Sequence, residues 1–72
     1  MSMVKKFEDI LNSLGYTKDE AKRNKNFSAV EAGYELGFLD KDDIAYMLND
    51  SISEIQADNR LVTKRRKYYG GS

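Results

Sequence analysis

The sequence predicts an all-α protein, a small helical domain of two or three short helices plus one long C-terminal helix. Apolar residues recur at spacings of three and four, and glycines and capping side chains divide the chain into segments. No stretch alternates apolar and polar residues as a strand would. The 72 residues suffice for a single domain. We expect residues 1–39 to form a short-helix head and residues 40–69 the long helix.

The first predicted helix covers residues 2–14, with Ser2 as its N-terminal cap. Gly15 is well placed as the left-handed residue that ends it, after which Tyr16 can pack back on the helix. One face carries the apolar residues at helical spacing, which are Val4, Phe7, Ile10, Leu11 and Leu14.

Thr17 and Glu20 have the spacing of a capping box, so a second helix is expected to start there. The polar run 22–26 includes two Asn and has a low helix propensity, which predicts a short exposed helix or a mobile turn.

A third helix is expected to open at Phe27-Ser28, where Ser28 and Glu31 form another candidate capping box. Gly37 is its predicted end. Its buried side is expected to comprise Ala29, Val30, Gly33, Tyr34 and Leu36. Gly33 costs about 1 kcal/mol inside a helix relative to Ala, so it suggests a close approach of another backbone.

The long helix is predicted to begin at Asp40, because Asp40 and Asp43 can accept hydrogen bonds from amides of its first turn. No Pro or Gly follows until Gly70. A helix over residues 41–68 would be about 42 Å long, whereas a compact domain of this size has a radius of gyration of about 11 Å. The far half of such a helix therefore needs a partner or stands in water.

The expected core gathers the apolar residues that share faces of these helices. They are Val4, Phe7, Ile10, Leu11, Leu14, Phe27, Val30, Tyr34, Phe38, Ile44, Met47, Leu48 and Ile52. The last five residues, 68–72, read as a frayed tail, and Gly70–Ser72 could be a cloning remnant.

Heptad spacing in the C-terminal part of the chain indicates a helical interface. From Leu48 to Tyr69, selected residues step by four and three, which is the repeat of a coiled coil. The partner is either another copy of the chain or a different protein in a larger assembly; alternatively, the helix only packs on its own core. The residues predicted to bind a partner are Ile52, Ile55, Asn59, Val62 and Arg66.

The net charge is zero, but charge is segregated along the chain. Residues 27–58 hold one Lys and eight Asp or Glu, a net of −7, and residues 59–72 hold five Lys or Arg and no acid, a net of +5. The basic residues could complement the helix dipole. The alternative is contact with nucleic acid, with Tyr68 and Tyr69 stacking on bases. That alternative site comprises Arg60, Lys64, Arg65, Arg66 and Lys67.

Residues 33–48 have the order of a helix–turn–helix motif: a short helix, a glycine turn and a capped second helix. The second of its helices would begin Lys41-Asp42-Asp43, and carboxylates repel phosphates, which argues against reading of a DNA groove. The same acidic run fails as a calcium loop, because Ala45 and Ser51 stand where Gly and Glu are needed.

Residue types that support common chemistry are absent. The chain has no Cys and no His, which excludes disulfides, thiolate ligands and the usual zinc sites. We expect no cofactor, no metal and no catalysis. Residues 1–15 lack a signal-peptide pattern, and no apolar run is long enough to span a membrane.

The sequence thus favours a non-enzymatic protein-interaction module, such as an adaptor, inhibitor or assembly component, that acts through the long helix. Such chains are typical of phages and plasmids, so the expected location is the cytoplasm or a virion. The alternative is a small nucleic-acid-binding regulator.

Overall fold

The computed structural model describes residues 3–70, with side-chain surroundings from residue 6 onward. It confirms the all-α class, and residues 3–70 contain no strand. The expectations for Ser2 and for the Val4 side chain fall outside the described parts. The five helices are α1 (Met3–Ser13), α2 (Lys18–Lys22), α3 (Phe27–Glu35), α4 (Lys41–Met47) and α5 (Glu54–Gly70).

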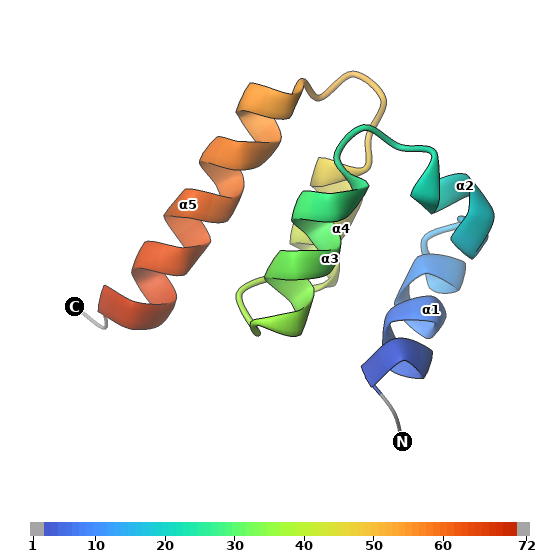
Figure 1. The fold of residues 1–72 in the computed structure, drawn as a ribbon, viewed down its shortest axis with the longest axis horizontal. Coiled ribbons are helices and arrows are strands. Elements are labelled where there is room, and N and C mark those ends of the chain that lie inside the picture. Colours follow the sequence, from blue (N-terminus) through green and yellow to red (C-terminus); the bar gives the residue numbers. More distant parts are fainter. Residues whose placement is uncertain (1–2, 71–72) are drawn as a thin grey trace.

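The helices form a flat arrangement with overall dimensions of 35 × 32 × 16 Å. In Figure 1, α3 and α4 lie in the middle, α1 and α2 on one side and α5 on the other. The chain runs down α3, up α4 and down α5, so that α5 packs against both α3 and α4, while α2 joins α1 to α3.

The two glycine stops are confirmed. Gly15 and Gly37 have φ angles of 91° and 85°. In each case the amide of the following residue bonds the carbonyl five residues earlier, at 2.9 Å. This is the Schellman arrangement, which a residue without a Cβ adopts at little cost.

Two of the predicted N-terminal caps are confirmed and one is wrong. Thr17 with Glu20 starts α2, and Asp40 with Asp43 starts α4, each through reciprocal side chain to backbone hydrogen bonds. Ser28 does not cap α3, because that helix already begins at Phe27.

The prediction of one continuous helix over 40–69 is wrong. Helix α4 ends at Met47, residues 48–53 form a turn, and α5 then runs for 17 residues, or about 26 Å. Ser53 and Gln56 form a capping box at the start of α5. The Gln56 amide donates to Ser53 Oγ at 3.1 Å, and the Ser53 amide donates to Gln56 Oε1 at 2.8 Å.

Side chains from the head of the molecule end α4. Asn26 Nδ2 donates to the Met47 carbonyl at 2.8 Å, and Asn24 Nδ2 donates to the Leu48 carbonyl at 2.8 Å. The Tyr16 hydroxyl also reaches the Leu48 carbonyl, at 3.3 Å. In a continuous helix these carbonyls would accept from amides four residues later. Here they are satisfied by residues 21 to 32 positions earlier in the chain.

The predicted core is largely confirmed. Phe7, Leu11, Val30, Phe38, Ile44, Met47 and Leu48 are buried, and Ile10, Leu14, Phe27, Tyr34 and Ile52 pack against them partly buried. The Phe7 ring lies 5.1 Å from the Tyr34 ring, measured between centroids, and so ties α1 to α3. Buried hydrophobic residues that were not predicted are Ala21, Leu39 and Ala57.

Gly33 marks a close approach, but of side chains and not of another backbone as its position inside a helix suggested. A Cβ built there would lie 2.6 Å from Cδ1 of both Leu39 and Leu61. The partners are side chains, and one of them comes from α5. The absence of a side chain at Gly33 therefore lets Leu61 of α5 pack closely against α3.

The expected frayed tail is wrong for Tyr68 and Tyr69. Helix α5 continues through Gly70, and the rings of Tyr68 and Tyr69 pack edge-on against Phe38, with centroid distances of 5.2 and 5.4 Å. Residues 71–72 lie outside the described part of the chain.

We predict that Asn26→Ala destabilises the protein by about 1–3 kcal/mol, because two backbone carbonyls, those of Met47 and Ile52, lose a buried donor. Urea unfolding followed by circular dichroism measures the change, with Asn12→Ala on the exposed side of α1 as the matched control. An unchanged Asn26→Ala midpoint would contradict the role given to this side chain.

Candidate functional site

Helix α5 has an inward face and an outward face. The inward face carries buried Ala57 and half-buried Leu61, and Arg60 and Lys64 lie on the same side of the helix. Because a helix repeats every 3.6 residues, Ile55, Val62 and their neighbours point to the opposite side. We call the set Ile55, Asn59, Val62 and Arg66 the outward face; all four are exposed.

An ionic cluster fastens α5 to α4. Asp43 is a buried carboxylate with a side chain only 1% exposed. Arg60 Nε donates to Asp43 Oδ1 at 2.8 Å, and Lys64 Nζ lies 3.1 Å from Oδ2. The Arg60 guanidinium also sits 4.6 Å from the centroid of the Tyr46 ring, a cation–π contact. These contacts set the rotation of α5 about its axis.

The pKa of Asp43 reflects this cluster. Burial alone would raise it, but hydrogen bonds from Arg60 and from the Asp40 amide, together with Lys64, lower the pKa below its ordinary value of 3.8. Asp43 is therefore ionised at neutral pH. Sequence reasoning assigned Asp43 only a capping role, because its two cationic partners lie beyond the unforeseen turn.

Four of the five predicted partner-binding residues come together and one does not. Ile55, Asn59, Val62 and Arg66 share the outward face of α5. Ile52 lies in the turn before α5 and is half-buried against the core, so it does not extend the face. The Ile55 side chain is 74% exposed and that of Val62 is 38% exposed.

A groove runs beside this face, between α3 and α5. Leu36 is 57% exposed at its edge, although the sequence predicted it to be buried. Asp58 and Arg65 stand on the α5 side of the groove, and it has a volume of about 350 Å³. The apolar lining is made of Ala32, Leu36, Phe38, Leu61, Val62 and Tyr69.

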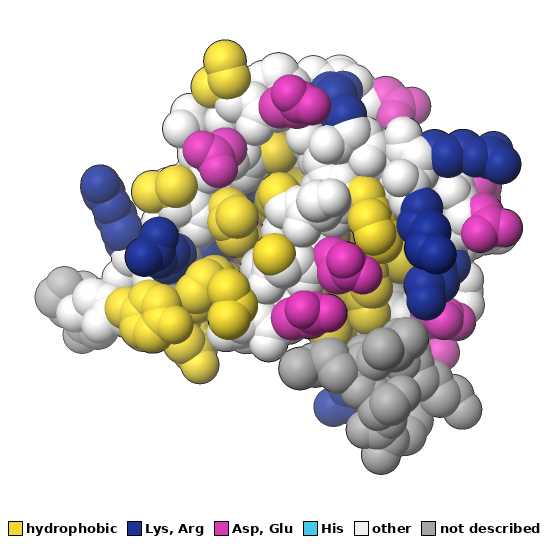
Figure 2. Space-filling model, in the orientation of Figure 1, with side chains coloured by type: hydrophobic (Ala, Val, Ile, Leu, Met, Phe, Trp, Pro, Cys, Tyr) yellow, Lys and Arg dark blue, Asp and Glu magenta, His cyan; other side chains and the backbone are white. Residues whose placement is uncertain are grey.

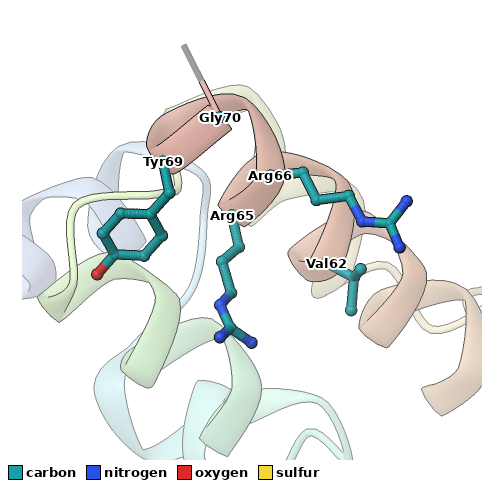
Figure 3. A pocket seen from close by; sticks show the side chains of 5 residues that line it. All are labelled: Val62, Arg65, Arg66, Tyr69 and Gly70. Atoms are coloured by element: carbon teal, nitrogen blue, oxygen red, sulfur yellow. The ribbon is translucent and has the colours of Figure 1, made fainter. Parts of the chain in front are cut away.

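A second, more open hollow lies at the C-terminal end of α5. Figure 3 shows Arg65 and Arg66 extending in different directions, with Val62 near Arg66 and the Tyr69 ring on the other side of Arg65. In Figure 2, hydrophobic side chains gather at this end of the molecule with Lys and Arg side chains next to them. The region thus combines apolar surface with positive charge.

The predicted basic tract is divided by the fold. Arg60 and Lys64 are bound to Asp43, whereas Arg65, Arg66 and Lys67 are exposed. The five residues of the nucleic-acid alternative therefore do not form a single patch, and two of them are bound to a carboxylate within the molecule.

No cluster of three or more Asp and Glu side chains in the described residues is arranged to hold a metal ion. None of the helices described is both long enough and apolar enough for a membrane span.

Models of known protein families, curated proteins and solved structures were compared with the chain, and none matches it.

We predict that Asp43→Asn lowers the free energy of unfolding at pH 7 by about 1.5–3 kcal/mol, the range for hydrogen bonds to charged groups. The pKa of Asp43 is lower in the folded than in the unfolded state. The stabilisation is therefore present above the ordinary pKa of 3.8 and is lost as the pH falls through the folded-state pKa.

Urea unfolding of the parent and of Asp43→Asn between pH 7 and pH 2 tests this, with the exposed neighbour Asp42→Asn as control. The difference between parent and Asp43→Asn should shrink on acidification. A difference that stays constant down to the acid end would show that the carboxylate charge is not what stabilises the α4–α5 contact.

Proposed function

We propose that this chain is a non-enzymatic protein-interaction module, acting as an adaptor, inhibitor or assembly component, that docks or oligomerises through the outward face of α5. The observation that carries the proposal is the pair of apolar side chains, Ile55 and Val62, exposed on the side of α5 opposite its own core.

The outward face contributes little to the fold. Helix α5 is positioned from its other side, by Ala57, by Leu61 against Gly33 and by the ion pairs of Asp43. Burying an exposed isoleucine or valine side chain against a partner gains about 1.5–3 kcal/mol. A single exposed apolar residue would not indicate a binding surface. Here, however, Leu36 and Tyr69 line the same groove as Val62 and extend the apolar surface.

The second candidate is a small nucleic-acid-binding regulator. Arg65, Arg66 and Lys67 are exposed and precede Tyr68 and Tyr69, which supports contact with phosphates and bases. The ion pairs that bind Arg60 and Lys64 to Asp43 weigh against it. Replacing the three exposed cations by Gln would remove nucleic-acid affinity and flatten its salt dependence if this candidate were correct.

The proposed setting is that of an accessory protein of a phage or plasmid, in the cytoplasm or within a virion. It rests on the small size, the absence of cysteine and the segregation of charge along the chain.

We predict that a photo-crosslinking amino acid placed at Ile55 or Val62 captures a protein partner in the cells that naturally make this chain. The same group at Lys22, exposed on α2, is the matched control. An adduct of about twice the chain's 8.3 kDa would identify a second copy, and any other mass a different protein.

Introducing Ile55→Asp should suppress the adduct formed from position 62, because a carboxylate buried at the interface costs several kcal/mol. The proposed function is wrong if positions 55 and 62 give no adduct, or if position 22 crosslinks equally well.

A further inference from the structure

Charge is distributed unevenly along the exposed side of α5. Glu54 and Asp58 lie in its N-terminal half, and Arg65 and Arg66 lie in its C-terminal half. Seven residues are almost two full turns of helix, so Asp58 and Arg65 share one flank of the outward face. Both residues line the groove beside α3, so this flank of α5 is the one next to α3.

This distribution favours one orientation of a self-paired helix. In a parallel pair of α5 helices, Arg66 of one copy would face Arg66 of the other across the seam between the helices. Like charges at a buried contact repel. Packed antiparallel, each acidic half meets the basic half of the other copy. The helix dipoles also oppose each other in that arrangement.

We infer that the partner of the outward face is a second copy of this chain, paired with α5 antiparallel to α5. This inference rests on the proposed function and names its partner. A two-fold axis near Val62 places Val62 against Val62 of the second copy, and sets Asp58 of each copy facing Arg65 of the other. Ile55 then lies near Tyr69 of the second copy.

The symmetry explains why Asp58 and Arg65 need to share a flank. In a face-to-face antiparallel pair, the two-fold axis runs across the helices and brings equivalent flanks to the same side. Asp58 therefore meets Arg65 twice, once in each direction. In a parallel pair the opposite flanks meet, and Asp58 would face the uncharged Gln56 or Thr63.

The paired surface is small, since α5 spans only about 26 Å. Interfaces below about 1,200 Å² are at the weak end of specific association, so the dimer should form in the micromolar range. Sedimentation equilibrium from about 10 µM to about 1 mM covers the transition.

The decisive experiment exchanges the two charges. Asp58→Arg and Arg65→Asp should each weaken self-association at least tenfold, because each places like charges together twice. An equimolar mixture of the two variants should form a heterodimer at least as tightly as the parent forms its dimer, since every contact is again between opposite charges. The double variant should likewise recover self-association.

Asp9→Arg and Lys6→Asp, exposed on α1, make the same charge changes away from α5 and should leave association unchanged. If the parent dimerises but neither exchange weakens it, or if the mixture stays monomeric, antiparallel pairing is wrong. A parent that is monomeric at about 1 mM, while positions 55 and 62 crosslink a different protein, overturns the second copy as partner and leaves the proposed function standing. A monomeric parent without such crosslinks overturns both.

Discussion

Two asparagine side chains at the α2–α3 turn determine the path of the second half of the chain. Asn24 and Asn26 donate to the last carbonyls of α4, so those carbonyls need no amides from a further helical turn. Asn26 is itself almost fully buried and also bonds the Ile52 carbonyl on the far side of the turn. The head of the molecule thereby closes α4 and directs α5 back across α3 and α4.

Once α5 returns, its position is fixed by complementary features of its neighbours. Gly33 leaves space for Leu61, and buried Asp43 holds Arg60 and Lys64. Because these contacts use one side of the helix, Ile55 and Val62 remain on the other. The exposed apolar face is thus a consequence of how the ionic cluster and the glycine orient α5, and it is the surface on which the proposed function depends.

Local signals in the sequence predicted much of this fold, and the turn over residues 48–53 was missed. The Gly15 and Gly37 stops and the Thr17 and Asp40 caps depend on neighbouring residues, so the sequence predicts them. The end of α4 depends on residues 21 to 32 positions away, which no local pattern reveals. Ser53 with Gln56 was a readable capping box, but the heptad spacing across it favoured a continuous helix. The same spacing correctly grouped Ile55 with Val62, whereas Arg60 and Lys64 could not be assigned to Asp43 without the turn.

Helix α5 folds back so that Tyr68 contacts Phe38. Nuclear Overhauser contacts between the ring protons of these two residues test this fold most directly. The fold predicts clear cross-peaks, because the ring centroids are 5.2 Å apart. A continuous helix over residues 40–69 would place Tyr68 about 40 Å from residue 40, beyond the reach of any such contact. Helical amide cross-peaks running unbroken through residues 48–53, with no Phe38–Tyr68 cross-peak, would contradict the account.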